Sequence, residues 1–65
     1  MQYFDYENCA REAGLSDDEL DRLRAVIRNE FPTDEMMYEL HLVRACFAIK
    51  DGHTTIDRIT STHAV

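Results

Sequence analysis

Residues 33–50, TDEMMYELHLVRACFAIK, decide the fold, because this segment is apolar on two separate faces of a helix. With about 100° of rotation per residue, its apolar side chains form two stripes, which we call the Met36 stripe (Met36, Leu40, Val43 and Phe47) and the Tyr38 stripe (Tyr38, Leu42, Ala45 and Ile49). One neighbouring helix cannot cover both stripes. We therefore expect a core helix that other helices of this chain, or of a second copy, enclose on two sides.

Local signals mark both ends of this central helix. The residue before a proline is disfavoured in the helical conformation, so Pro32 predicts that any preceding helix ends near Phe31. Thr33 is predicted to cap the central helix, whose body covers residues 34–50. Gly52 supplies the left-handed residue that commonly follows the last turn of a helix.

The clearest helix start elsewhere lies at Ser16. Ser16 and Glu19 have the spacing of a capping box, and Leu15 and Leu20 have the spacing of the hydrophobic staple that accompanies it. A helix is therefore predicted over residues 17–31. One face of it carries a continuous apolar row formed by Leu20, Leu23, Val26, Ile27 and Phe31. We expect this row to cover the Met36 stripe of the central helix.

Two weaker helical patterns complete the fold. Residues 2–13 place Tyr3, Tyr6, Ala10 and Ala13 at three- and four-residue steps, and Gly14 ends the pattern. A short fourth helix, capped by Thr54, is possible over residues 55–60. Residues 60–65 are predicted to be a flexible tail. The fold class is therefore all-α, a small bundle of three main helices (about 2–13, 17–31 and 34–50) with an optional fourth (about 55–60), in a single domain over residues 1–59.

Length and charge restrict the partners of the chain. With 65 residues, the chain lies near the lower limit for folding alone, so a second copy would add useful buried area. It has 13 acidic and 7 basic residues and a net charge of −6, which disfavours nonspecific binding to nucleic acid. No apolar run approaches the roughly 20 residues of a membrane span, so we expect no membrane partner.

Cys9 and Cys46 are the only cysteines, and they are too far apart in sequence for a C-x-x-C motif. Without a signal peptide or a larger set of cysteines, free thiols and a cytoplasmic location are expected. No spacing typical of a catalytic triad, a metal site or a phosphate-binding loop occurs. We therefore predict no enzyme activity, no catalytic or metal-binding residues and no cofactor.

The two stripes also predict an interface. Alanine contributes little area, so a helix over residues 2–13 should leave part of the Tyr38 stripe exposed, and an exposed apolar patch on a small protein commonly marks a contact surface. A symmetric homodimer is the simplest way to cover such a patch. Its candidate residues are Met37, Tyr38, Leu42 and Ile49.

His41 and Arg44 form a candidate polar notch on the same helix. Arg44 could bind a carboxylate or a phosphate through two hydrogen bonds, with His41 as a titrating neighbour. The alternative is that both residues belong to the solvent-exposed side of the helix. Both interpretations fit the sequence.

These observations favour a small acidic protein-interaction or regulatory module that self-associates. An alternative comes from residues 9–23, where the spacing of Ala10, Gly14, Leu20 and Leu23 resembles that of the helix-turn-helix family. The resemblance implies a DNA-binding regulator whose second helix enters the major groove by its first turn, here residues 16–19. Three of these four residues are acidic and would repel phosphate. A further alternative is an acidic inhibitor that occupies a basic nucleic-acid-binding site on a partner protein.

Overall fold

The computed structural model describes residues 2–63, with side chains as far as residue 60. Over these residues the chain forms four helices and no strand: α1 (Tyr6–Glu12), α2 (Asp17–Glu30), α3 (Glu35–Lys50) and α4 (Ile56–His63). The predicted all-α fold is confirmed, and the fourth helix is present. None of the described helices is both long and apolar enough to span a membrane. Residues 64 and 65, the end of the predicted tail, lie outside the described part of the chain.

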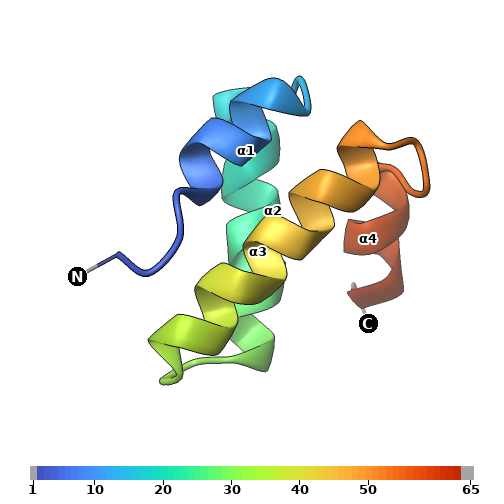
Figure 1. Ribbon diagram of the computed structural model, residues 1–65. Helices are drawn as coiled ribbons and strands as arrows, with labels where there is room; N and C mark the ends of the chain where they lie inside the picture. The colour runs from blue at the N-terminus through green and yellow to red at the C-terminus, as the bar shows by residue number, and fades with distance from the viewer. Residues whose placement is uncertain (1, 64–65) are drawn as a thin grey trace.

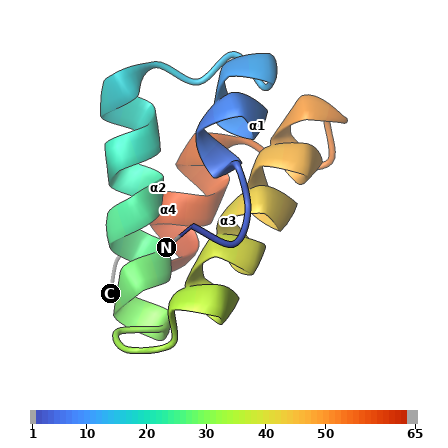
Figure 2. The ribbon, with the colours of Figure 1, turned by 60° about the vertical axis from the view of Figure 1, so that its left-hand side comes forward.

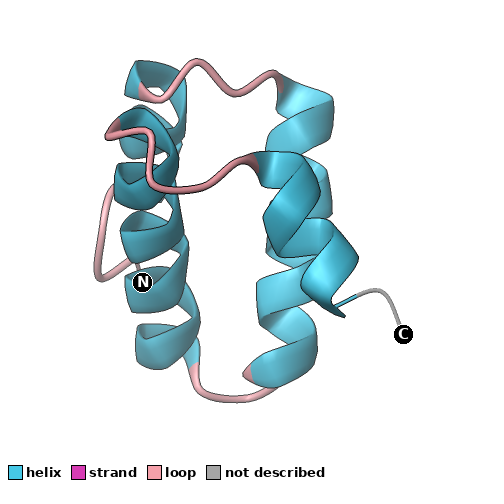
Figure 3. Cartoon of the chain, turned by 90° about the vertical axis from the view of Figure 1, so that its right-hand side faces the viewer, coloured by secondary structure: helices cyan, strands magenta, loops and turns pink. Residues whose placement is uncertain are grey.

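The helices lie in two layers. α1 and α3 form one layer, and α2 and α4 form the other (Figures 1 and 3). The packing agrees with this view, because α3 packs against α1 within its layer and against α2 across the layers, whereas α4 packs against α2. α1 covers only the upper part of α3 (Figure 2). The central helix thus holds the two layers together while much of its length stays open on one side.

α1 begins at Tyr6, four residues later than predicted. Asp5 is its N-cap, with the Asp5 carboxylate accepting the N–H of Asn8 at 3.2 Å. The N–H groups of residues 3 and 4 both donate to Oε1 of Glu39 on α3, at 2.7 and 2.8 Å. Because these long-range bonds hold residues 3 and 4 in a non-helical segment, the helix starts only after Asp5.

The capping box predicted at Ser16 is confirmed. Ser16 Oγ accepts the N–H of Glu19 at 3.2 Å, and the N–H of Ser16 donates to Glu19 Oε1 at 2.9 Å. The cap of α3 is Asp34 rather than the predicted Thr33, since the Asp34 carboxylate accepts the N–H of Met37 at 3.2 Å. A carboxylate at this position also interacts favourably with the positive end of the helix dipole.

α4 also starts one residue later than predicted. Thr55, not Thr54, caps it through the hydroxyl oxygen, which accepts the N–H of Arg58 at 3.2 Å. This register turns Ile56 into the core, where only 8% of its surface is exposed. α4 continues to His63, so the first four residues of the predicted tail are helical instead.

The core is one small cluster with members from all four helices: Ala10, Leu23, Ile27, Tyr38, Leu42, Cys46 and Ile56. α3 contributes Tyr38, Leu42 and Cys46, which recur every four residues on one face. Met36 and Phe47 are instead 49% and 48% exposed. The prediction that α2 covers the Met36 stripe is therefore wrong, and α1 and α2 together cover the side of α3 that carries Tyr38, Leu42 and Cys46.

Tyr38 faces inward because both its ring and its hydroxyl find partners there. The hydroxyl accepts a hydrogen bond from Arg24 Nε at 3.2 Å. Tyr6 packs edge-on against the Tyr38 ring, with 6.3 Å between the ring centroids. Both faces of α3 are apolar, so periodicity could not select the buried one. The partners on α1 and α2 make that selection.

Glu39 is a buried acid that the periodicity did not identify. Only 2% of its surface is exposed, and its Oε1 accepts the N–H groups of Tyr3 and Phe4. A buried carboxylate is costly unless it is hydrogen-bonded. Glu39 therefore requires residues 3 and 4 to lie along α3, and it ties the N-terminal segment to the central helix.

Replacing Ser16 by alanine is expected to remove the cap of α2. The loss of an N-cap costs about 1 kcal/mol, which in a domain of this size lowers the thermal midpoint by roughly 4–8 °C. Thermal unfolding followed by circular dichroism measures this shift. Thr33→Ala is the matched control and should leave the midpoint nearly unchanged, because Thr33 is exposed and does not cap α3. Equal midpoints for the two variants would contradict the capping role of Ser16.

Glu39→Ala is expected to release residues 3 and 4 and to lower the free energy of unfolding by about 1–3 kcal/mol, the range for losing hydrogen bonds to a charged acceptor. Glu39→Gln keeps an acceptor oxygen in the same place, so its loss should be smaller. Urea unfolding measures the stability, and amide hydrogen exchange at Tyr3 and Phe4 reports the two bonds directly. Unchanged protection of both amides in Glu39→Ala would show that the carboxylate does not hold the segment.

Candidate functional site

Two of the large apolar side chains that the fold leaves exposed lie on α3. Within the described residues, three are about half exposed: Tyr3 at 51%, Met36 at 49% and Phe47 at 48%. Met36 and Phe47 are the two ends of the Met36 stripe, and Leu40 and Val43 between them are partly exposed. The stripe therefore forms a continuous apolar row along the outer side of the central helix.

The Met36 stripe lies outside the core. Ala45 and Ile49 are among the partly buried residues that pack against the core, whereas Leu40 and Val43 are not. On a helical wheel, the centre of the stripe lies roughly 120° from the centre of the buried face of α3. A second surface can therefore approach the stripe without disturbing the core.

The backbone of Tyr3, in the N-terminal segment, lies beside the stripe. Its N–H donates to Glu39 at 2.7 Å, and Glu39 is a neighbour of both Met36 and Val43 on the helix surface. Single exposed apolar residues are common on proteins, but a row of them is typical of a contact surface. The site that the geometry supports best is therefore the Met36 stripe.

The interface predicted on the Tyr38 stripe is closed to a partner. Tyr38 and Leu42 are only 2% and 0% exposed, and Ile49 packs against the core. Met37 is partly exposed, and it flanks the Met36 stripe. The Tyr38 stripe is buried because α1 and α2 both approach α3 from the Tyr38 side, where the small residue Ala10 is itself buried.

The two residues of the predicted polar notch have different surroundings. The His41 and Phe31 ring centroids are 4.5 Å apart, and His41 Nδ1 lies 2.9 Å from the carbonyl oxygen of Met37. His41 is thus packed between the end of α2 and its own helix. Arg44 is exposed, and no ion pair joins it to another described residue. It is an isolated cation on the flank of the Met36 stripe.

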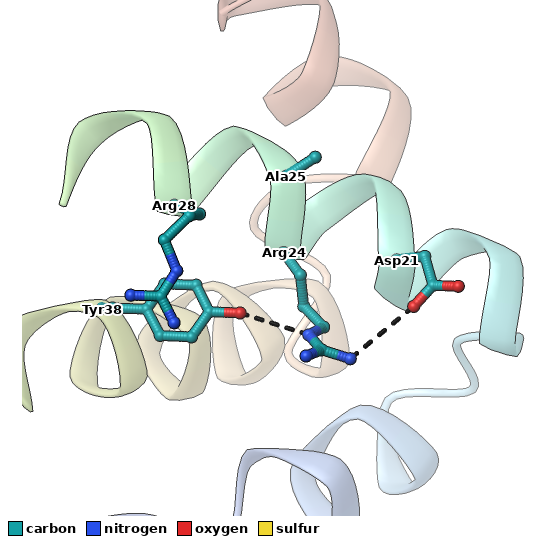
Figure 4. A pocket seen from close by; sticks show the side chains of 5 residues that line it. All are labelled: Asp21, Arg24, Ala25, Arg28 and Tyr38. Atoms are coloured by element: carbon teal, nitrogen blue, oxygen red, sulfur yellow. Dashed lines mark hydrogen bonds and ion pairs between the residues drawn. The ribbon is translucent and has the colours of Figure 1, made fainter. Parts of the chain in front are cut away.

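Arg24 and Arg28 of α2 line a groove beside Tyr38 (Figure 4). The groove has a volume of about 420 Å³ and is completed by Asp21 and Ala25. The Arg28 guanidinium lies over the Tyr38 ring, with 3.5 Å between its central carbon and the ring centroid, and Arg24 Nε donates to the Tyr38 hydroxyl at 3.2 Å. A cation–π contact and a hydrogen bond therefore join α2 to α3.

The groove is better explained as a clasp between two helices than as a ligand site. Both guanidinium groups already have acidic partners, Arg28 with Glu35 at 3.0 Å and Arg24 with Asp21 at 3.8 Å. The groove therefore has no surplus positive charge to attract an anion. The hydrogen bond to Tyr38 raises the pKa of Arg24, so this contact favours the charged guanidinium. The sequence did not predict the clasp, because Tyr38 was expected to be partly exposed on an interface. The one available signal was the four-residue spacing of Arg24 and Arg28, which places both arginines on one face of α2.

The residues that resemble a helix-turn-helix motif match it only in part. Ala10 and Leu23 are buried, and Gly14 has a positive φ of 79°. However, α1 packs chiefly against α3. Asp17 and Asp18 are exposed at the start of α2. The first turn of this helix therefore presents carboxylates where the motif would contact phosphate.

The cysteines belong to the core and its border. Cys9 and Cys46 are both free thiols, and Cys46 is fully buried. Burial raises the pKa of the Cys46 thiol to about 11, so this group stays protonated and unreactive at neutral pH. Within the described part of the chain, no three His, Cys, Asp or Glu side chains are arranged to hold a metal ion.

Comparisons of the chain with protein-family models, with curated proteins and with solved structures found no match. Among the described residues, the four side chains of the Met36 stripe form an apolar row that is outside the core cluster and is about half exposed at both ends.

Proposed function

We propose that this protein is a small interaction module that self-associates through the Met36 stripe of α3. The observation that carries the proposal is the row of four apolar side chains outside the core, whose end residues Met36 and Phe47 are about half exposed. Such a row is stabilised when it meets a second apolar surface, because apolar area is then removed from water. A second copy supplies that surface.

The charges along α3 favour a second copy as the partner. Asp34 and Glu35 stand at the start of the helix, and Lys50 stands at its end. A copy that runs in the opposite direction brings unlike charges together at both ends. A two-fold axis also needs only one kind of surface, and added burial suits a chain of 65 residues.

The proposed association is weak. The stripe and its flanking residues Met37 and Arg44 make up six residues of each copy, whereas stable interfaces use about 20–30 on each side. Dissociation constants of about 10 µM to 1 mM are therefore expected. Monomer and dimer would both be populated over this range of concentration.

Phe47→Glu is expected to abolish the association, because each copy would then place a charge within the apolar row. Sedimentation equilibrium from about 10 µM to 1 mM should show the average mass of the wild type rising towards two chains and that of Phe47→Glu staying at one. Ala25→Glu is the matched control, since Ala25 is exposed on α2 and receives the same change of charge. Circular dichroism should show that both variants are folded.

Two results would refute the proposal. A wild-type chain that stays monomeric up to about 1 mM would lie outside the expected range of affinity. Equal weakening by Phe47→Glu and Ala25→Glu would show that charge alone, and not the Met36 stripe, controls the association.

Duplex DNA distinguishes the proposal from the helix-turn-helix alternative. We expect no mobility shift of a random duplex at low salt and micromolar protein, because Asp17 and Asp18 are exposed at the start of α2 and repel phosphate. A complex that dissociates on adding salt, and that Arg22→Ala weakens, would instead support a DNA-binding regulator.

A further inference from the structure

We infer that the two copies pair through antiparallel α3 helices, about a two-fold axis that passes between Leu40 and Val43. The inference rests on the self-association proposed above and adds its orientation and register. Each residue of the Met36 stripe then has an assigned neighbour: Met36 of one copy meets Phe47 of the second copy, and Leu40 meets Val43.

The spacing of the Met36 stripe is that of a short coiled-coil seam. Steps of four, three and four residues separate its members, which is the alternation of a heptad repeat over about two heptads. When the Met36 stripes of two copies pack antiparallel, each layer of the seam contains two different residues of the stripe. The outer layers then combine methionine with phenylalanine, and the inner layers combine leucine with valine.

A parallel pair would stack each residue on its own equivalent. One layer would hold two phenylalanines and another would hold two valines, so the space between the helices would be filled unevenly. The antiparallel register distributes side-chain volume more evenly along the seam. It also places the thioether of Met36 against the aromatic ring of Phe47, which is a favourable contact. Packing therefore favours the antiparallel pair.

The charges favour the same orientation. In the antiparallel pair, the end of each α3 that carries Lys50 lies beside the start of the other α3, and the two helix dipoles run in opposite directions. In a parallel pair, the acidic starts of both helices would lie side by side. Lys50 and Glu35 each already have a partner in their own chain, at 2.9 and 3.0 Å. The charges at the two ends of α3 therefore favour the antiparallel orientation but add little to the affinity of the dimer.

The surroundings of the stripe leave room for a second helix. Arg44 borders the stripe on one side, and its apolar stem can lie along the other copy while its exposed head stays in water. On the opposite side, the backbone of Tyr3 is hydrogen-bonded to Glu39. α1 covers only the upper part of α3 (Figure 2). The 16 residues of α3 span about 24 Å, which suffices for the four layers.

Paired cysteine variants test the orientation. Met36→Cys and Phe47→Cys are each made in a Cys9→Ala background, which leaves the introduced thiol as the accessible one because Cys46 is fully buried. In the antiparallel pair, a mixture of the two variants brings the new thiols together and keeps one complete methionine–phenylalanine layer at the other end. Thiols at equivalent positions are then about 16 Å apart along the axis, too far for a disulfide.

With oxidised glutathione as the oxidant, the mixture is expected to form several-fold more disulfide-linked dimer than either variant alone, as measured on a non-reducing gel. Circular dichroism should show both variants folded, since Met36 and Phe47 are about half exposed. Faster linkage within each variant alone would overturn the antiparallel orientation and leave the proposed self-association standing. No linkage in any sample, with a dimeric wild type, would overturn the assigned register.

Discussion

The burial of Tyr38 orients the central helix, and the rest of the structure depends on that orientation. Arg24 donates to its hydroxyl at 3.2 Å, and the Arg28 guanidinium lies 3.5 Å from the centre of its ring. Because an α-helix is rigid over these distances, Leu42 and Cys46 follow Tyr38 into the core at successive turns. The same rigidity turns the Met36 stripe outward. The clasp between α2 and α3 and the exposed apolar row are therefore two results of one constraint.

Local structure could be predicted where a few neighbouring residues determine it. The capping box at Ser16 needs only Glu19, and Gly14 and Gly52 adopt a positive φ where a helix ends. The caps of α3 and α4 were each placed one residue too early. In both cases two adjacent residues have side chains that can cap a helix. Which of them does so depends on where the helix must start for its apolar side chains to reach the core. That information comes from the core and not from the cap.

The buried face of α3 could not be predicted from periodicity, because both stripes are apolar. What separates them is a set of polar contacts with distant residues. The Tyr38 hydroxyl accepts a hydrogen bond from Arg24 on α2. The Glu39 carboxylate accepts hydrogen bonds from the N–H groups of residues 3 and 4, more than 30 positions away in the sequence. An exposed apolar face on α3 was therefore predictable in kind, but the sequence pattern placed it on the Tyr38 stripe, which is buried. Glu39 itself carried no sequence signal, since an acid between two apolar stripes is normally exposed.

The hydrogen bonds of Glu39 also determine how this chain can be joined to other polypeptides. Because the carboxylate holds residues 3 and 4 beside α3, a domain fused ahead of residue 2 starts at the edge of the Met36 stripe. A domain fused after α4 starts in the other layer (Figure 1). A bulky tag fused ahead of residue 2 would crowd the Met36 stripe, whereas the same tag fused after α4 would leave the stripe open.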